Sequence, residues 1–473
     1  MPITKLPFAG GFYQSDSLPL SAQQCVNWYP VKPQGGALND EALYPSAGIN
    51  LLTTSGEGEN RGASLLGETP YFVNGTTAYR LEPDFTLTAL GTVEGTARVS
   101  LAQNGTQLMI LVPGGKGYVI TQSPDTFAEI TDLDFVANGN PQHATFVDGY
   151  FSATTDQKKN IVSNLNDATT WDALDFGSVE SDPDKVVAPF VYRNQLFMGG
   201  SVTCEGLQNI GGADFPFQRT GLFFDKGVYS PHSLVNASDS VFFIGGGVNE
   251  SPAIWAVQGN SVSKVSTDSI ESVLQPLTAE QLNATYAITY AQKGAYFVVF
   301  YTPEITLELN ITTGLWNERR SRITSDGTVA DVTHRVSSAL TAYGKVLVGD
   351  SIDGRIGEMS PEFKTEYGEL ITRSFTTQPF QNNMQSFSLP SIELTMESGV
   401  GDDETTDPVI WMERSADGKT FKGSRIRPIG KVGEYTKRAI WRRNGRAARF
   451  EVLRFTMNDP VTANVLQLTA DIV

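Results

Sequence analysis

The residue types that could perform chemistry are few in this chain and lie far apart. Its three histidines are His143, His232 and His334, and none has a second ligand at the spacing typical of metal sites. The two cysteines, Cys25 and Cys204, complete no zinc pattern with them and are too few for a disulfide framework. Folding can bring distant ligands together, but the spacing itself predicts no metal site and no cofactor.

Neighbouring carboxylates are the next candidates, because glycosidases hold two carboxyl groups about 5–10 Å apart across a sugar cleft. Such pairs occur at Asp132 and Asp134, at Asp182 and Asp184, and at Asp402 and Asp403. Carboxylates this close together in turns usually cap loops or face water, and we expect the same here. Residues 114–117, Gly-Gly-Lys-Gly, lack the Ser or Thr of a phosphate loop and instead predict a hairpin turn. No catalytic residue is predicted.

The C-terminal region carries the one basic cluster of the chain. Residues 419–454 contain twelve Lys or Arg against two acids, although the whole chain has a net charge of −17. Tryptophan among arginines can bind nucleic acid by stacking and phosphate contact. On a strand, however, alternate residues face opposite ways, so Trp441 points away from Arg442 and the cluster is not one flat basic face. We favour a protein interface, with DNA binding and a solvated edge strand as alternatives. Its residues would be Lys437, Arg438, Trp441, Arg442, Arg443 and Arg446.

The remainder of the chain is strongly acidic, which disfavours general binding to nucleic acid. Such a surface serves solubility, or it forms the wall of a conduit that must not hold a polyanion. The N-terminus lacks the charged and apolar blocks of a signal peptide, and no run is long and apolar enough to span a bilayer. With only two cysteines, we expect folding in a reducing cytosol.

These candidate residues must be positioned by β-structure. From about residue 68, a short apolar strand, a turn and a second strand recur at intervals of roughly 35–55 residues, which predicts a β-propeller of about six or seven blades. Asn74-Gly75 is the clearest hairpin signal among these units. Ile270, Val273 and Leu274 share a helical face, and Thr278 to Gln281 fits a capping box.

The expected architecture is therefore all-β, with a β-propeller-like N-terminal domain, a small helical insert and a C-terminal β-sandwich. The turn-rich residues 1–60 are expected to form an extended arm. Residues 61–375 would form the propeller-like domain, with the insert at about 267–285, and the alternating strands of residues 376–473 would form the sandwich.

Four stretches, in order along nearly the full length, resemble the tail hub (nozzle) proteins of short-tailed bacteriophages, also called packaged-DNA stabilisation proteins. The first is residues 24–30, Gln-Cys-Val-Asn-Trp-Tyr-Pro, followed by 43–49, Leu-Tyr-Pro-Ser-Ala-Gly-Ile. The second is residues 95–102, Gly-Thr-Ala-Arg-Val-Ser-Leu-Ala, and the third is 277–282, Leu-Thr-Ala-Glu-Gln-Leu. The fourth is residues 438–446, Arg-Ala-Ile-Trp-Arg-Arg-Asn-Gly-Arg, with 459–461, Asp-Pro-Val. Residues 120–260 contribute little to the resemblance.

This resemblance implies a virion structural protein without enzymatic activity, made in the cytoplasm of a host bacterium. The tail hub proteins of this family form a homo-hexameric ring below the portal and the head-to-tail adaptor protein. They close the head to retain packaged DNA, anchor tailspikes or tail fibres, accept a needle or plug protein, and conduct double-stranded DNA without reading its sequence. The alternative functions are a glycan-binding propeller and a virion-associated glycan depolymerase.

Overall fold

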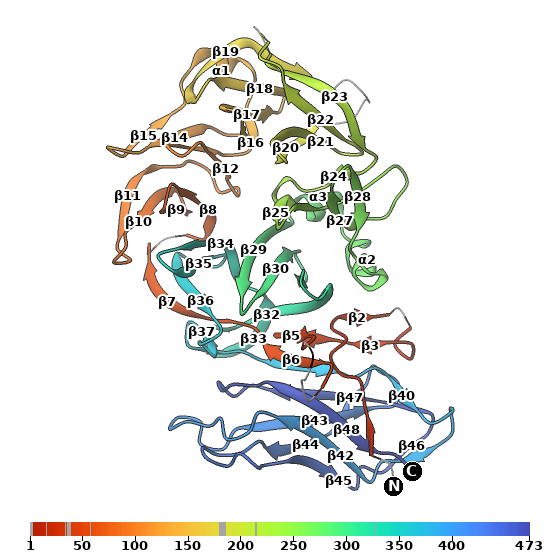
Figure 1. Cartoon of the computed structure of the whole chain (residues 1–473). Helices are drawn as coiled ribbons and strands as arrows, with labels where there is room; N and C mark the ends of the chain where they lie inside the picture. The colour runs from red at the N-terminus through yellow and green to blue at the C-terminus, as the bar shows by residue number, and fades with distance from the viewer. Residues whose placement is uncertain are drawn as a thin grey trace.

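The computed structural model describes residues 3–473 apart from 16, 34, 36–38, 57, 179–185, 213–214 and 326. Over these residues the chain forms a ring of β-sheet blades that sits on a β-sandwich, with both termini at the far end of the sandwich (Figure 1). About 56% of the chain is strand and about 4% is helix. The predicted all-β class, a propeller followed by a sandwich, is confirmed.

The first four blades are antiparallel four-stranded sheets that follow one another along the chain. Blade 1 contains β8 (Asn60–Leu66), β9 (Thr69–Asn74), β10 (Thr77–Leu81) and β11 (Leu87–Thr92). Blade 2 contains β12 (Ser100–Gln103), β13 (Gln107–Leu111), β14 (Gly117–Thr121) and β15 (Thr126–Glu129). After α1 (Leu133–Ala137), blade 3 contains β16 (Pro141–Val147), β17 (Tyr150–Thr155), β18 (Lys159–Asn164) and β19 (Asp167–Ser178). Blade 4 contains β20 (Val186–Tyr192), β21 (Gln195–Gly200), β22 (Cys204–Asn209) and β23 (Phe217–Phe224).

Three further blades complete the ring, so that the described residues form seven in all. Blade 5 contains β24 (Gly227–Val228), η1 (Pro231–Ser233), β25 (Val235–Ala237), β26 (Ser240–Gly246), β27 (Ala253–Gln258) and β28 (Ser261–Lys264). Blade 6 contains β29 (Tyr286–Gln292), β30 (Ala295–Tyr301), β31 (Thr306–Asn310) and β32 (Leu315–Ser325), which also pairs with β33 (Thr328–Thr333). Blade 7 contains β34 (Val336–Ala342), β35 (Lys345–Asp350), β36 (Arg355–Ser360) and β7 (Gly48–Thr54).

Tight turns explain why these segments form hairpins. The inner hairpins of blades 3, 4, 6 and 7 are joined by two residues that both have positive φ, as a type I′ turn requires. These pairs are Asp148-Gly149, Arg193-Asn194, Lys293-Gly294 and Tyr343-Gly344. The predicted Asn74-Gly75 hairpin joins β9 to β10, and residues 114–117 lie at the turn between β13 and β14. The local turn chemistry therefore sets the register of the blades.

The helical insert, expected at about residues 267–285, lies between blades 5 and 6. It consists of α2 (Asp268–Leu274) and α3 (Ala279–Asn283). Thr278 accepts a hydrogen bond from the backbone of Gln281, whose side chain accepts one from the backbone of Thr278, so the capping box is present. Ile270 and Leu274 are fully buried in the apolar cluster that blades 5 and 6 share with the insert.

The sandwich consists of two sheets packed over one apolar core. One sheet has the order β45 (Ala439–Arg442), β42 (Ser391–Met396), β48 (Val465–Asp471), β6 (Ala42–Pro45) and β5 (Trp28–Val31), with β1 (Ile3–Lys5) also paired to β48. The other has β39 (Arg373–Thr376), β47 (Phe450–Met457), β43 (Val409–Ser415) and β44 (Lys422–Pro428), with β40 (Phe380–Gln381) on β47. Shorter pairs are β2 (Tyr13–Gln14) with β3 (Ala22–Gln23) and β41 (Phe387–Ser388) with β46 (Arg446–Ala447). β37 (Thr365–Glu366) pairs in parallel with β7 and antiparallel with β38 (Glu369–Leu370), so these two strands extend the sheet of blade 7.

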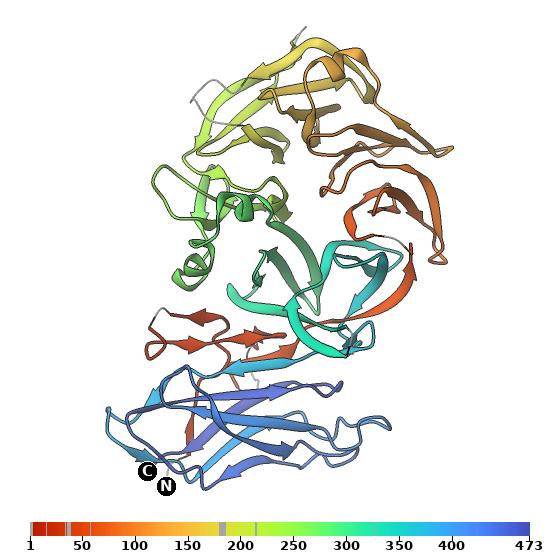
Figure 2. The ribbon, with the colours of Figure 1, turned by 180° about the vertical axis from the view of Figure 1, so that it is seen from behind.

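The first 60 residues, expected as an extended arm, pair with strands of both domains. β1 pairs with the last strand of the chain, and β5 and β6 extend a sandwich sheet. β7 pairs with β36 and so closes blade 7 with a strand from the other end of the propeller sequence. Both ribbon views show this N-terminal segment between the ring and the sandwich (Figures 1 and 2). It therefore closes the ring and also attaches the sandwich.

A two-residue strand, β4 (Cys25–Val26), joins the sheets of the two domains. Val26 pairs in parallel with Glu318 of blade 6 and antiparallel with Ser374 of the sandwich. Blade 6 and one sandwich sheet thus become a single sheet of eleven strands. Because hydrogen bonds run unbroken across β4, the domains are held as one body.

Asn27 fixes the chain where it leaves β4. It is 1% exposed and has a φ of 54°. Its side-chain nitrogen donates to the carbonyls of Arg320 (2.9 Å) and Thr372 (2.8 Å), and its oxygen accepts from the Arg320 amide (3.0 Å). Asparagine tolerates the left-handed region better than most residues and has both a donor and an acceptor. One side chain therefore bonds both domains.

A buried ionic cluster supports the same junction from the propeller side. Arg319 of β32 is fully buried and donates to Glu308 (3.2 Å), to the Tyr290 hydroxyl (3.1 Å) and to the carbonyl of Ala47 (3.1 Å). Glu366 lies 3.8 Å from Arg319 and accepts a hydrogen bond from Ser321. Burial favours the neutral acid, but the contacts with His334, Arg319 and Ser321 outweigh it and hold the pKa of Glu366 below its usual value.

Replacing Asn27 with Ala is expected to weaken the coupling between the domains. The change leaves part-buried backbone groups of Arg320 and Thr372 without their side-chain partner and strains the left-handed backbone, at a cost of about 2–4 kcal/mol. By calorimetry, we expect a lower melting temperature and separation of the propeller and sandwich transitions. Asn166→Ala is the control, because Asn166 is exposed with a φ of 57° and tests the backbone strain alone. Identical melting of the two variants would contradict the role given to Asn27.

Replacing Arg319 with Met is expected to cost about 3–5 kcal/mol, because it leaves buried carboxylates without their cation. Arg319 is one of the groups that hold the pKa of Glu366 down, so its loss raises that pKa relative to the native protein. The stability that the ionised carboxylate loses in the variant is lost in the native protein too once the group is protonated, so the deficit should narrow as the pH falls towards the acid range in thermal unfolding. Arg193→Met, which removes an exposed guanidinium whose partner Asp239 is also exposed, is the control and should cost at most about 1 kcal/mol. A deficit that is constant with pH would contradict this account.

Candidate protein interface on the C-terminal sandwich

The basic segment predicted as an interface lies at the edge of a sandwich sheet. Among the described strands, β45 pairs only with β42, so one side of this strand faces away from its sheet. Ala439 and Trp441 are buried while Arg442 is exposed, which is the alternation expected of a strand. Trp441 is 0% exposed, packs against Phe455 and donates from Nε1 to the Arg425 carbonyl (2.8 Å). Its side chain therefore belongs to the sandwich core and presents no surface to a partner.

The free side of β45 is covered by arginines of the neighbouring strand β44. Arg427 donates to the carbonyl of Ile440 (2.7 Å), and Arg425 donates to the carbonyl of Arg442 (2.8 Å). Arg425 also donates to the Asn444 side chain (2.7 Å). These guanidinium groups bond the acceptors that an unpaired edge otherwise offers to another strand. The edge therefore favours contact through side chains over the addition of a β-strand.

The remaining basic residues fall into two groups. Arg438 forms a two-point contact with Glu393 (2.6 and 2.5 Å), and hydrogen bonds to this carboxylate raise the pKa of Arg438. Lys437 lies 3.7 Å from Glu434, and Arg446 donates to Ser386 (2.6 Å). Among the described residues, the side chains of Arg442 and Arg443 are exposed and have no hydrogen-bond or ion-pair partner. Of the six predicted interface residues, Arg442 and Arg443 therefore carry the cations that remain available to a partner.

Exposed apolar residues of the same sandwich were missed by the sequence reasoning. Ile426 on β44 is 49% exposed, and Val432 and Tyr435 on the loop before β45 are 63% and 73% exposed. Aromatic and arginine side chains together are typical of interface centres. No periodic pattern marks a loop such as this, so only the folded structure shows that its apolar residues remain uncovered.

The carboxylate pairs have structural positions. Asp132 caps α1 by accepting from the amides of Asp134 and Phe135, and Asp402 accepts from the amides of its own turn. The pair at 182 and 184 lies outside the described residues.

Cys25 is buried, and burial raises the pKa of its thiol well above the usual range. Over the described part of the chain, no three His, Cys, Asp or Glu residues are grouped as metal ligands.

Two of the three histidines come together in the fold although they lie far apart in sequence. His143 and His232 meet with their ring centroids 4.9 Å apart, because blades 3 and 5 both contribute to the centre of the propeller. His334 instead joins the buried cluster, 2.9 Å from the Tyr301 hydroxyl and 3.0 Å from Arg319. Separation in sequence was therefore a poor guide to their separation in space.

None of the helices in the described residues has the length and apolar character needed to cross a membrane.

Comparison with known families decides what this pair of domains represents. The family described as Bacteriophage P22 Gp10, beta-propeller, matches residues 4–364. The family described as Bacteriophage P22 Gp10, beta-sandwich, matches residues 372–473. The chain belongs to the bacteriophage P22 Gp10 family. The resemblance to tail hub proteins of short-tailed phages is confirmed.

A curated member of this P22 Gp10 family is the tail hub protein gp10 of Salmonella phage P22. It is 22% identical over 414 residues, which is 84% of each chain. Among solved structures, the WD40 propeller domain of Doa1 matches at 13% identity with a TM-score of 0.40, covering 67% of this chain and 98% of that domain. The Pan2 WD40 domain of Neurospora crassa matches at 11% identity with a TM-score of 0.41, covering 66% and 92%.

Truncating Trp441 and truncating the exposed arginines are expected to have different effects on stability. Trp441→Ala removes a fully buried side chain and should lower the free energy of unfolding by about 3–5 kcal/mol. The double variant Arg442→Ala/Arg443→Ala changes only exposed groups and should stay within about 0.5 kcal/mol per site. Denaturant unfolding checks both values. A larger loss in the arginine variant than in the tryptophan variant would show that these positions were assigned wrongly.

Proposed function

We propose that this chain is a structural component of a phage tail, in which six copies form the hub ring below the portal and its adaptor. The match of the two P22 Gp10 families to both domains, in order along the chain, carries this proposal. The curated relative is itself named as a tail hub protein. The protein then acts in the virion tail and is made in the host cytoplasm.

The charge of the chain suits a ring through which DNA passes. Each copy has a net charge of −17, so six copies carry about −100. A lumen wall of that sign repels the phosphate backbone and lets double-stranded DNA slide without being held. In this role the ring closes the head after packaging, retains the DNA and conducts it during ejection.

The fold suits a protein that transmits mechanical force between other components of the virion. The eleven-stranded sheet makes the propeller and the sandwich one body, so force on one domain reaches the other through backbone hydrogen bonds. Such a body anchors tailspikes or tail fibres, meets the head-to-tail adaptor, and accepts a needle or plug protein at the distal end. No enzymatic activity is part of this proposal.

The basic edge of the sandwich is the proposed contact with an acidic neighbour. Arg442 and Arg443 are exposed and unpaired in the described structure, and Tyr435 and Val432 add apolar area on the same strand and loop system. Charge complementarity sets the register and the association rate of such a contact. Arg438 and Lys437 already have acidic partners within the subunit and orient the edge.

Reversing the charge of this edge is expected to impair ring assembly or adaptor binding. In the variant Arg442→Glu/Arg443→Glu/Arg446→Glu, like charges oppose an acidic partner and should weaken association at least about tenfold. Analytical ultracentrifugation and imaging of the purified protein, with and without the adaptor, measure this. The matched variant with Lys at the three positions keeps the charge and should assemble nearly normally.

Two outcomes would overturn parts of this proposal. Unchanged assembly of the glutamate variant would remove the interface role of the basic edge while leaving the hub role intact. Failure of the native chain to form a ring, either alone or on the adaptor, would instead contradict the hub proposal itself.

A further inference from the structure

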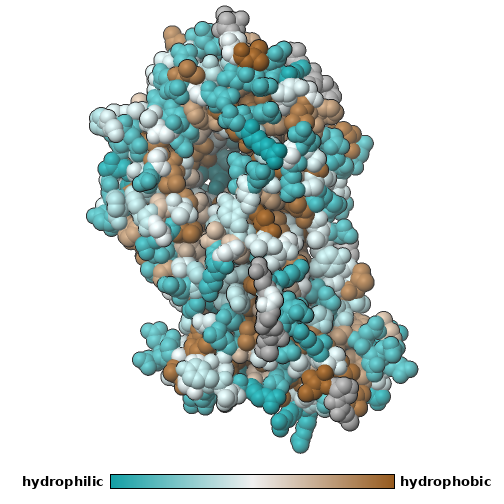
Figure 3. All heavy atoms as spheres, viewed as in Figure 1, coloured by the Kyte–Doolittle hydropathy of each residue, from teal (hydrophilic) through white to brown (hydrophobic). Residues whose placement is uncertain are grey.

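The centre of the propeller contains a cavity to which all seven blades contribute. It has a volume of about 380 Å³ and is lined by residues of the innermost strands β8, β12, β16, β20, β25, β29 and β34. An adjoining pocket of about 590 Å³ shares Arg98, His143 and His232 with it. The space-filling view shows the ring hollowed at its centre on this face (Figure 3). Arg98, His143 and His232 lie where the central cavity and the adjoining pocket meet.

Arg98 provides a positive charge that no carboxylate balances within the described residues. Its guanidinium donates to Ser337 Oγ (2.9 Å) and to the Ser337 carbonyl (2.5 Å), and it lies 4.1 Å above the ring of Tyr286. No ion pair to Arg98 occurs in the described part of the chain. Burial lowers its pKa, which shows how little compensation the charge receives. A partly buried cation of this kind favours an anion beside it.

The histidine pair adds unused hydrogen-bonding groups to the same place. His143 is 8% exposed, and its ring meets that of His232 edge-on at 81°. Within the described structure, the ring nitrogens of both residues lack hydrogen-bond partners. Burial lowers the pKa of His143 to about 3. The pKa of His232 is also lowered, mainly by burial and further by the neighbouring His143 and Arg98. Both rings are therefore neutral at pH 7, and each has one N–H to donate.

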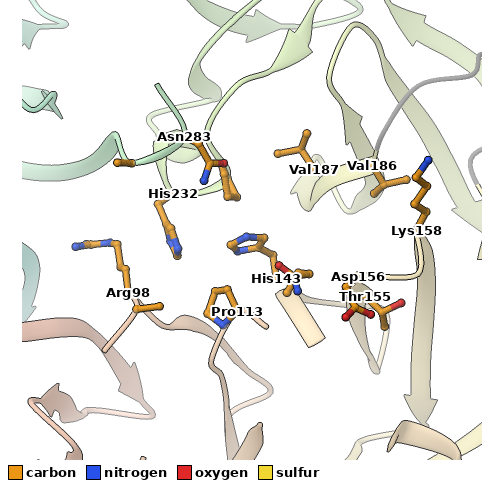
Figure 4. Close-up of a pocket in the computed structure, with 14 residues that line it drawn as sticks. Arg98, Pro113, His143, Thr155, Asp156, Lys158, Val186, Val187, His232 and Asn283 are labelled. Atoms are coloured by element: carbon orange, nitrogen blue, oxygen red, sulfur yellow. The ribbon is translucent and has the colours of Figure 1, made fainter. Parts of the chain in front are cut away.

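The close-up shows how these side chains face the pocket (Figure 4). His143 and His232 point toward one another, with Arg98 beside His232. Lys158 and Asp156 lie at the opposite rim, close to Thr155. The donors thus converge from the segment before β12, from β16 and from η1, and Asp156, the single acid that lines the pocket, lies away from Arg98.

We propose that the Arg98–His143–His232 cluster is an oxyanion-binding site, which takes a phosphate or carboxylate group entering from the 590 Å³ pocket. One guanidinium and two imidazole N–H groups supply the charge-assisted and neutral donors that such an oxyanion accepts. A divalent metal fits less well, because Arg98 repels a cation and no third ligand is grouped with the histidines in the described residues. The site is separate from the basic edge of the sandwich.

The three histidines allow a direct test, because the chain has only these imidazoles to label. The full-length protein is labelled with ¹³C at the histidine ε1 carbons and titrated with inorganic phosphate, and in parallel with succinate, at pH 7 and constant ionic strength. We expect saturable shifts of the His143 and His232 resonances, with a dissociation constant on the order of millimolar for the better ligand. His334 lies in the separate buried cluster and should not shift, so it is the internal reference.

Variants separate binding at this cluster from general ion effects. Arg98→Gln and, independently, His143→Asn/His232→Asn should weaken binding at least about tenfold. Isothermal calorimetry measures this for the double histidine variant, which has lost the two resonances. Arg193→Gln is the matched control, because Arg193 also lies over a tyrosine ring, 5.2 Å from Tyr192, but is exposed on a turn outside the pocket. It should bind like the native protein.

The phosphate and succinate titrations and the binding measurements on the variants each test whether the cluster binds an oxyanion. Preference for phosphate or for succinate identifies the source of the oxyanion, and binding of either supports the site. The proposal is overturned if neither ligand shifts His143 and His232, or if Arg98→Gln binds as tightly as the Arg193→Gln control. It is also overturned if Zn²⁺ shifts both resonances while neither oxyanion does.

Discussion

The whole molecule depends on the continuity of hydrogen bonds through β4. Val26 pairs with Glu318 on one side and with Ser374 on the other, so the sheet of blade 6 does not end where the sandwich begins. Asn27 then bonds both sides with its side chain. Because β4 pairs on both sides, the domains cannot separate without leaving backbone donors and acceptors unpaired. The same N-terminal segment continues into β7, which closes the propeller.

Some arginines of the chain stabilise the junction of the two domains, and others remain available to partners. Arg319 and Arg373 are fully buried near the junction, where they bond carbonyls and, for Arg319, a carboxylate. Arg442 and Arg443 lie exposed at the sandwich edge and Arg98 at the centre of the propeller, all without an acidic partner in the described residues. In a chain with a net charge of −17, these three cations are positions at which an anionic group can bind.

Sequence patterns predicted the features that neighbouring residues determine. The Asn74-Gly75 turn, the capping box at Thr278 and the burial alternation around Trp441 all depend on contacts within a few residues. The pairing partners of residues 1–60 are hundreds of positions away, so a turn-rich composition indicated an arm and not its partners. His143 and His232 were missed as neighbours for the same reason, since only closure of the ring brings blades 3 and 5 together. The arginines that cover β45 also needed the folded structure.

The central claim is that the N-terminal segment joins propeller and sandwich into one body. Hydrogen–deuterium exchange of peptides spanning residues 22–31 tests it most directly, because these residues contain the shared strand and Asn27. The account predicts protection as strong as that of β30 and β47, the buried strands on either side of the junction. Exchange of residues 22–31 as fast as in exposed turns, while β30 and β47 stay protected, would contradict it.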